Sequence, residues 1–169
     1  MPDATGLELI AHELREANEG SILETEFRRG RAVLVIVREH VPAVLQQLHD
    51  KGYTFLASLH GVDYYPDEPR LGVLYELMDM REVDRISVKT RVSTQDPRVP
   101  TVTGLFPGAN FPEREAYDMF GIVFEGHPDM RRILMPEDFE GFPQRRDFPI
   151  GGEPVLFTYN EETGYGKDQ

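Results

Sequence analysis

The sequence predicts an α+β fold: a largely antiparallel or mixed sheet with helices on one side, followed by an extended, proline-rich C-terminal strap. Several segments alternate apolar and polar residues, as antiparallel strands with one covered face do. Three other segments carry apolar residues at helical spacing. Residues 121–169 contain 5 of the 13 prolines and 7 of the 15 glycines, so regular backbone pairing is not expected to continue there. We therefore expect an α+β domain over residues 1–120 and an interaction strap with its tail over residues 121–169.

The first expected element is a helix near the N-terminus. Its apolar residues recur every three or four positions, at Leu7, Ile10, Leu14 and Ala17. The residues from Thr5 to Glu8 form a capping-box pattern, and Gly20 suits the end of the helix. Residues 1–26 hold seven acidic side chains and one basic one. We interpret this acidity as a solvated helix face rather than an acidic binding arm.

A β-hairpin and a second helix are expected next. Residues 23–28 alternate apolar or β-prone side chains with charged ones, residues 32–37 are continuously apolar, and Arg29, Gly30 and Arg31 mark the turn between them. Pro42 then stands near a helix start, apolar residues follow at positions 41, 44, 45 and 48, and Gly52 suits the stop.

Three further strands are expected in the middle of the chain. Residues 53–65 are aromatic and β-prone, with a bulge or bend at Gly61. The Pro-Asp-Glu-Pro stretch at residues 66–69 is a turn. Residues 71–77 and 86–92 alternate in the manner of two strands.

Two groups of polar residues on these strands have a functional and a structural interpretation. Arg85, Lys89 and Arg91 form a basic row, which either receives an acidic partner surface or keeps a solvated strand face soluble and guards a sheet edge. We favour the second. His60 and Asp63 could be a metal pair, but two ligands without a third nearby favour a hydrogen-bonded, half-buried histidine.

A third helix is expected over residues 111–120. Residues 99–106 allow one short helical turn before it, Asn110 can cap it with Glu113 three residues on, and Gly121 ends it. Ala116, Met119 and Phe120 form its apolar side.

Four residues in this region could carry acid–base or metal chemistry: Glu113, Glu115, Asp118 and His127. The three acidic residues point in different directions around a helix, and the chain has no nucleophile elbow, zinc helix motif, phosphate loop or dinucleotide fingerprint. We favour a polar hub, in which Arg114 bridges carboxylates and His127 anchors the turn at residues 128 and 129.

The strap is too apolar to be a solvated tail, although its prolines exclude regular structure. The arginine pairs at 131–132 and 145–146 suit bidentate binding of carboxylates on another chain. We expect residues 121–134 to fold back on the domain, residues from Phe139 onward to pack mainly against a neighbouring subunit, and the last dozen residues to be loose.

Composition excludes several classes of function. The net charge of −12 argues against a nucleic-acid partner. The absence of cysteine excludes thiolate-ligated zinc and cysteine-ligated iron–sulfur clusters on this chain. The first 20 residues resemble neither a signal peptide nor a transit peptide. The longest strongly apolar run, residues 32–37, falls far short of the ~20 residues of a membrane helix.

The chain also resembles a known family. The pattern consists of Glu113-Arg114-Glu115, Asp118-Met119-Phe120, His127, Arg131 and Ile133-Leu134. With this spacing it resembles the signature of the 30 kDa (NuoC-type) subunit of respiratory complex I, the bacterial NADH:quinone oxidoreductase. The stretch PEDFEGFPQRRDFP at residues 136–149 resembles the family's next segment, with Gln144 in place of the usual leucine. The similarity covers residues 30–157, and its spacing is specific.

The resemblance implies a cofactor-free accessory subunit of the peripheral arm, with FMN and the iron–sulfur clusters on partner subunits. It implies contacts with the large, 49 kDa-like quinone-site subunit and with the subunit that holds the terminal iron–sulfur cluster, on the cytoplasmic side of a bacterial plasma membrane. No catalytic, cofactor-binding or metal-binding residue is then expected here. The expected structural or interface residues are Glu113, Arg114, Glu115, Asp118, His127, Arg131, Arg132, Arg145, Arg146 and Asp147.

Two alternatives remain open at this point. One is the equivalent subunit of a related membrane-bound hydrogenase or dehydrogenase complex. The other is a free-standing metal-dependent hydrolase, which rests only on Glu113, Glu115, Asp118 and His127.

Overall fold

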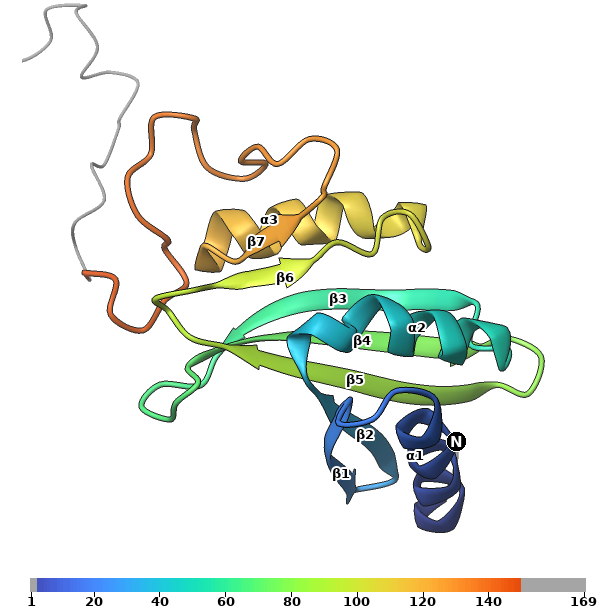
Figure 1. Cartoon of the computed structure of the whole chain (residues 1–169). Helices are drawn as coiled ribbons and strands as arrows, with labels where there is room; N and C mark the ends of the chain where they lie inside the picture. The colour runs from blue at the N-terminus through green and yellow to red at the C-terminus, as the bar shows by residue number, and fades with distance from the viewer. Residues whose placement is uncertain (1–2, 150–169) are drawn as a thin grey trace, which may run out of the picture.

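The computed structural model describes residues 3–149, and ten regular elements follow one another in that range (Figure 1). They are α1 (Ala4–Ala17), β1 (Ile22–Arg28), β2 (Arg31–Ile36), α2 (Val41–Asp50), β3 (Phe55–Asp63), β4 (Leu71–Asp79), β5 (Asp84–Val92), β6 (Arg98–Pro100), α3 (Asn110–Phe120) and β7 (Val123–Glu125). Short 3-10 turns precede α2 (η1, Arg38–His40) and α3 (η2, Pro107–Ala109).

Five strands form one mixed sheet in the order β1-β2-β5-β4-β3. All neighbouring pairs are antiparallel except β2 and β5, which run parallel with Val33 opposite Ser87. That parallel pair requires the long crossover through α2, β3 and β4. A second, two-stranded sheet joins β6 and β7 in parallel. The expected α+β class with a mixed sheet is confirmed.

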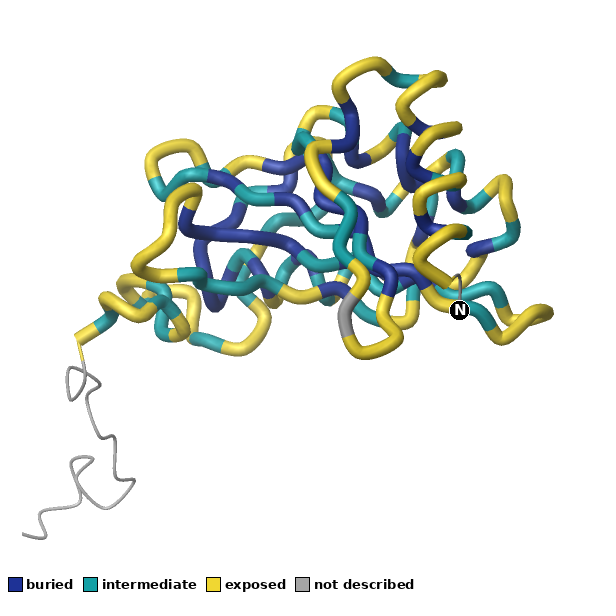
Figure 2. The backbone as a smooth tube through the Cα atoms, turned by 90° about the horizontal axis from the view of Figure 1, so that it is seen from below, coloured by how far each residue is buried: buried dark blue, intermediate teal, exposed yellow. Residues whose placement is uncertain are grey.

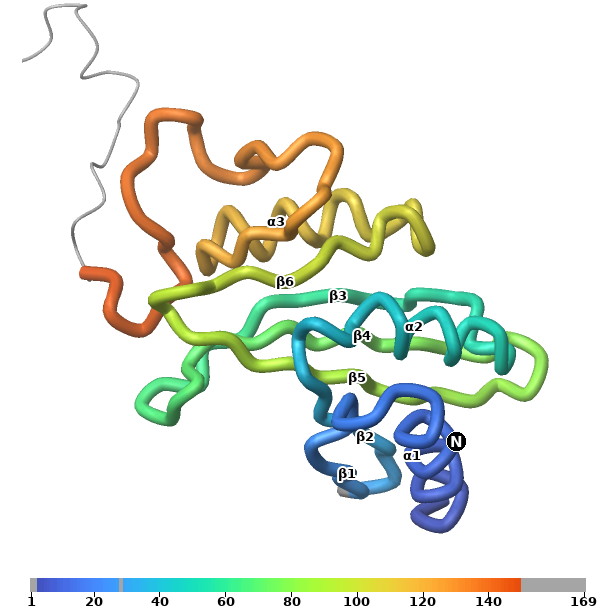
Figure 3. Tube along the Cα trace, viewed as in Figure 1, coloured from blue at the N-terminus to red at the C-terminus, as the bar shows by residue number. Residues whose placement is uncertain are grey.

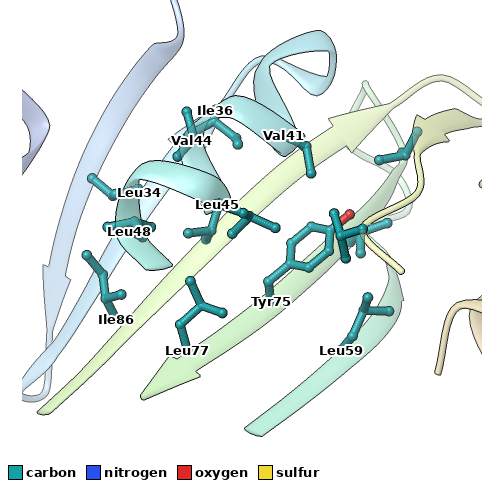
Figure 4. Packing of buried hydrophobic residues seen from close by; sticks show 14 of the residues in the cluster. Leu34, Ile36, Val41, Val44, Leu45, Leu48, Leu59, Tyr75, Leu77 and Ile86 are labelled. Atoms are coloured by element: carbon teal, nitrogen blue, oxygen red, sulfur yellow. The ribbon is translucent and has the colours of Figure 1, made fainter. Parts of the chain in front are cut away.

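All three helices pack on one face of the main sheet, as the sequence predicts. Figure 4 shows α2 contributing Val41, Val44, Leu45 and Leu48 to a core with side chains of β2, β3, β4 and β5. The strand residues labelled there are Leu34, Ile36, Leu59, Tyr75, Leu77 and Ile86. The inner residues of α1 (Leu7, Ala11 and Leu14) join the same core next to β1 and β2. Full burial of each large apolar side chain stabilises the fold by about 1.5–3 kcal/mol.

Helix α3 lies on β3, and a glycine permits the close approach. Gly61 pairs regularly with Val73, and a Cβ at this position would overlap the Phe120 ring of α3. The bulge expected at Gly61 is therefore misplaced, because the register of β3 shifts between Leu56 and Ser58 instead. Gly61 is needed for packing against a helix rather than for bending the strand.

The ends of several elements differ from expectation by a few residues. Asp3 caps α1 in place of Thr5, since its carboxylate accepts a hydrogen bond of 2.7 Å from the backbone N–H of Gly6. Asn110 lies inside α3, because the 3-10 turn before the helix leads straight into it. Residues 99 and 100 end β6, and the expected short helical turn follows, since the backbone N–H groups of Leu105 and Phe106 donate to the carbonyl oxygen of Val102 at 3.0 and 2.8 Å. Gly121 ends α3 with φ 74°, as predicted.

The hairpin between β1 and β2 is confirmed. Its two turn residues, Arg29 and Gly30, have φ values of 50° and 73°. Two successive positive φ values match the twist of the flanking strands, which is the geometry that tight hairpins favour.

After β7 the strap arches over α3 and returns to the end of the main sheet where β3 stops and β4 starts (Figures 1 and 3). Figure 2 shows its backbone as mostly intermediate or exposed, in contrast to the buried central strands. Within residues 3–149, no helix has the length and hydrophobicity that a membrane crossing requires.

Candidate functional site

The candidate site consists of α3 and the part of the strap that packs on it, residues 121–149. Two acidic residues of α3, Glu113 and Asp118, are completely buried, which is unusual for carboxylates. They lie on different sides of the helix and serve different parts of the chain.

Glu113 connects α3 to the segment that follows β6. Its carboxylate accepts hydrogen bonds from the hydroxyl of Thr101 at 2.6 Å and from the backbone N–H of Val102 at 2.8 Å. Burial raises the pKa of Glu113 to about 7, although these two donors oppose the shift. The fully buried hydroxyl of Tyr75 in β4 has no hydrogen-bond partner among the described residues, and burial together with the Glu113 charge raises its pKa well above its usual value.

His127 lies beside Glu113 and is equally buried, with 4.0 Å between its Nε2 and the Glu113 carboxylate. Nδ1 of His127 accepts a hydrogen bond of 3.0 Å from the backbone N–H of Asp129, and Nε2 lies 3.2 Å from the carbonyl oxygen of Asn110. This arrangement assigns the proton to Nε2 of a neutral ring. His127 thus ties the turn after β7 to the start of α3.

Asp118 gathers one loop of the strap, residues 131–135, around a single carboxylate. One oxygen accepts hydrogen bonds from the backbone N–H groups of Ile133, Leu134 and Met135 at 2.9, 2.7 and 2.9 Å. The other oxygen accepts one from Arg132 at 2.6 Å. Burial by itself would raise the pKa of Asp118, but these four donors together hold it below its usual value.

Arg114 holds the same loop from the next turn of the helix. Its guanidinium donates to the carbonyl oxygens of Arg131 and Arg132, both at 3.1 Å. The expectation that Arg114 bridges carboxylates is therefore wrong. Carbonyl oxygens of the loop take that position because the prolines on either side prevent the loop from satisfying its own backbone groups.

The fixed backbone of the 131–135 loop presents two apolar side chains to solvent. Ile133 is 37% exposed and Leu134 is 60% exposed. Phe111, in the first turn of α3, is also exposed. A rigid loop with outward aliphatic side chains is suited to contact with another protein.

Further along the strap, residues 142–145 pack on the C-terminal end of α3. A Cβ on Gly121 would overlap both Phe142 and Arg145, so this glycine serves a close approach as well as a positive φ. Arg145 donates to the carbonyl oxygen of Phe120 at 2.6 Å and lies over the Phe142 ring at 4.5 Å. The Phe142 ring also meets Tyr117 edge-on, with centroids 6.3 Å apart.

The strap is fixed to the main sheet by an ion-pair cluster that the sequence did not reveal. Arg70 donates to Asp63 at 2.6 and 2.8 Å and to Asp147 at 2.7 and 2.8 Å. Asp63 also accepts from the backbone N–H of Arg146 at 2.8 Å. The Arg70 guanidinium holds the pKa of Asp63 well below its usual range and lowers that of Asp147.

These contacts correct the expectation that the arginine pairs of the strap bind carboxylates on another chain. Three of the strap's four paired arginines are occupied within the chain, since Arg131 binds Asp129 at 2.7 Å, Arg132 binds Asp118 and Arg145 binds a carbonyl. The expectation that residues from Phe139 onward pack mainly against a neighbouring subunit stays a prediction. Within the chain, Phe139 stacks on Phe148 at 6.0 Å, and Phe142 covers Gly121. The expected loose dozen at the C-terminus lies outside the described residues.

The candidate metal ligands do not converge. His60 lies on the face of β3 opposite to Asp63, because they are an odd number of positions apart and no bulge separates them. Glu115 is exposed, and Asp118 turns away from the pair formed by Glu113 and His127. Residues 3–149 contain no group of three His, Cys, Asp or Glu side chains that could hold a metal ion.

Comparisons with known proteins agree on one family. The family model described as "Respiratory-chain NADH dehydrogenase, 30 Kd subunit" matches residues 34–154. The chain is similar to an NADH-quinone oxidoreductase subunit of Roseiflexus sp. (strain RS-1), with 45% identity over 92% of this chain and 91% of that protein. It is also similar to the same type of subunit from Herpetosiphon aurantiacus, with 47% identity over 80% of this chain and 81% of that protein.

Two solved structures share the fold. A trypsin-resistant fragment of Nqo5 aligns with a TM-score of 0.64 and 41% identity, covering 73% of this chain and 98% of the fragment. A chain of an archaeal membrane-bound sulfane sulfur reductase aligns with a TM-score of 0.70 over 96% of this chain and 93% of that chain. At 24% identity, this second likeness concerns the fold alone.

Proposed function

Since the chain belongs to the family of the respiratory-chain NADH dehydrogenase 30 kDa subunit, we propose that it serves as that subunit in an NADH:quinone oxidoreductase. In this role it is an accessory subunit of the peripheral arm, and the oxidoreductase activity belongs to the whole complex. The observation that carries the proposal is the match over residues 34–154 together with 45% identity over 92% of the chain.

The proposed role is to hold a binding surface in a fixed shape. Glu113 and Asp118 are the most buried acidic residues of the site, and both accept hydrogen bonds from other segments of the same chain. Because Asp118 and Arg114 fix the 131–135 loop before any partner arrives, binding through Ile133 and Leu134 requires little further ordering. The signature residues therefore act as scaffold and interface residues, and not as catalysts.

The partners that we propose are the large quinone-site subunit and the terminal-cluster subunit of the same complex. FMN and the iron–sulfur clusters belong to partner subunits, and this chain holds none of them. The complex is placed on the cytoplasmic side of a bacterial plasma membrane. We also propose that the chain divides at Gly121 into an α+β domain, residues 1–120, and an interaction strap and tail, residues 121–169.

Affinity purification from the native host tests this assignment. A tagged chain, extracted from membranes with mild detergent, should bring the quinone-site and terminal-cluster subunits with it in equal amounts, and the eluate should reduce a quinone analogue with NADH. Recovery of hydrogenase or sulfur-reductase subunits would instead assign the chain to a related complex. Recovery of the chain alone would contradict the proposal that it is a subunit of a complex.

A matched pair of leucines tests the surface. Leu134→Ser should reduce the amount of copurified subunits at least fivefold, because it removes an apolar contact from a fixed loop. Leu9→Ser, at a leucine of α1 that is 62% exposed, is the control and should leave the recovery unchanged. Equal recovery with both variants would exclude the 131–135 loop as a binding surface.

A further inference from the structure

The face of the main sheet that points away from the helices carries a basic site whose arginine side chains have no ion-pair or hydrogen-bond partner among the described residues. Leu34, Tyr75 and Ile86 point to the helices, so the residues that alternate with them point to the other side. No helix of the described chain covers this side. Its basic residues come from β2 and β5, which lie next to each other in the middle of the sheet.

Two of these basic residues already have partners. Lys89 donates to Glu26 of β1 at 3.0 Å, and Arg91 donates to the carbonyl oxygen of Pro69 at 2.7 Å. Both also lie over the ring of Tyr64, at 5.4 and 4.6 Å from its centroid. Since β5 is a central strand, the interpretation that this row guards a sheet edge is wrong.

Arg31 and Arg85 have no such partners. The parallel register places Val33 of β2 opposite Ser87 of β5, so the residues two positions earlier, Arg31 and Arg85, are neighbours on adjacent strands. Both side chains are exposed, and neither makes an ion pair or a hydrogen bond with the described residues. Like charges on neighbouring strands destabilise a sheet unless an anion lies between them.

Arg31 and Arg85 both line a hollow of about 290 Å³, whose other polar lining residues are Ser58, His60, Glu76 and Ser87. Ser87 donates a hydrogen bond of 2.8 Å to Glu76, whose carboxylate is in no ion pair with the described residues. With His60 counted as neutral, two arginines and one glutamate give the hollow a formal charge of one positive unit. This balance suits one carboxylate better than a phosphate polymer, which the net charge of −12 would also repel.

We propose that this hollow binds a carboxylate side chain from an acidic segment of a neighbouring subunit in the same complex. The planar guanidinium groups suit bidentate binding of a carboxylate. Phe55, 49% exposed, shares a cross-strand row with Met78 and Arg85, so an apolar residue beside the acidic one would find a contact. This face of the sheet is then a second interaction surface, in addition to the strap. The inference rests on the proposed function only because it assumes that the complex exists.

Arginine footprinting of the wild-type protein is the first test. Phenylglyoxal modification, followed by mass spectrometry, compares the purified complex with the isolated chain. We expect Arg31 and Arg85 to react at least tenfold more slowly in the complex. Arg15, on the outer face of α1, is the control and should react at similar rates in both. Unchanged reactivity at Arg31 and Arg85 in the complex would overturn the inference.

Zero-length cross-linking identifies the occupant. Arg85→Lys keeps the charge and supplies an amine, which a carbodiimide can couple to a carboxylate in contact with it. We expect a cross-linked peptide that carries an Asp or Glu of another subunit. A cross-link only to residues of this chain, or only to a lipid or a nucleic acid, would contradict the proposal.

Charge reversal supplies the third readout, and its outcomes separate the two proposals. Arg85→Glu should lower the copurification of the acidic partner at least fivefold, whereas Arg81→Glu, in the exposed β4–β5 turn, should not. If the wild-type chain copurifies with no other subunit, both proposals fail. If the complex forms normally with Arg85→Glu and its arginines are unprotected, only this inference fails.

Discussion

At the scale of single residues, the protein uses buried charges to fix geometry. Asp63 and Asp118 are both matched by donors, whereas Glu113 accepts only two neutral hydrogen bonds and has a neutral histidine beside it. Burial of a charge is unfavourable unless donors replace the lost water. Asp63 and Asp118 have more donors than Glu113, including a charged arginine, and their pKa values are therefore lowered. Glu113 has only neutral donors, and its pKa is raised.

Glu113 should make stability depend on pH. Its pKa is raised from 4.5 to about 7 by burial, so the folded state binds the proton more tightly than the unfolded state. The contribution is complete below pH 4.5 and is lost as the pH rises through 7, and it amounts to a few kcal/mol at ~1.4 kcal/mol per pKa unit. Urea unfolding of Glu113→Gln at pH 5 and pH 8 should show that this dependence has disappeared. Glu115→Gln, exposed on the same helix, should keep it.

Arg70 should contribute more to stability than its exposed partner does. Arg70→Ala leaves the Asp63 carboxylate, which is only 3% exposed, without its ion-pair partner and with backbone N–H donors alone, and we expect a loss of about 3–5 kcal/mol. Asp147→Ala removes a partner that is 56% exposed, and the loss should stay below ~1 kcal/mol. Denaturant midpoints of the two variants measure the difference. Equal losses would show that the backbone N–H groups of Tyr65 and Arg146 are enough to stabilise the Asp63 carboxylate.

At the scale of elements, α3 is the connection between the sheet and the strap. Its inner face packs on β3 through Phe120, and its other sides hold the 131–135 loop and residues 142–145. The strap has few backbone pairs of its own, because prolines interrupt it. Side chains of α3 satisfy its backbone N–H and carbonyl groups instead.

Asp118→Asn should release one loop of the strap while leaving the sheet intact. An amide oxygen is a weaker acceptor than a carboxylate, and the variant also loses the ion pair with Arg132. We expect a loss of about 2–3 kcal/mol in stability and faster hydrogen exchange at the N–H groups of residues 133–135. Exchange in β5 under native conditions is the internal control. Unchanged exchange at residues 133–135 would mean that the loop is held by other contacts.

At the scale of the whole molecule, one face of the main sheet is covered by other elements and the opposite face is not. Helices, the small β6–β7 sheet and the strap lie over one face of the main sheet, while the opposite face retains the pair formed by Arg31 and Arg85. The molecule thus offers two separate surfaces to neighbours. This is the organisation expected of a protein that lies between others in a larger complex.

The isolated chain should show no NADH-dependent quinone reduction. Its sequence has no cysteine and no nucleotide-binding loop, and its buried carboxylates are engaged in structural contacts. The assay compares the purified chain, a buffer blank and the purified complex with the same quinone analogue. A rate for the chain alone above the blank would contradict the accessory role.

Much of the fold could be predicted from the sequence because its elements have strong local signals. The alternation at residues 71–77 and 86–92 and the helical spacing from Val41 to Leu48 each matched an observed element. The Arg29–Gly30 turn and the stop at Gly121 were also predictable, since both require positive φ. The caps and the bulge were misplaced, because neighbouring residues such as Asp3 and Thr5 are equally suitable on local grounds. The three-residue strands β6 and β7 were not predicted, because such short segments carry no clear alternation.

The sequence by itself determined the elements, their hydrophobic faces and the family signature, because these depend on residue type and spacing within short segments. Only the tertiary structure decided what the charges do. The pairing of Arg70 with Asp147 spans 77 positions, and the neighbourhood of Arg31 and Arg85 depends on a parallel strand pair formed through a long crossover. Local spacing carries no information about such contacts, since they arise from the order in which strands join the sheet and from the path by which the strap returns to it.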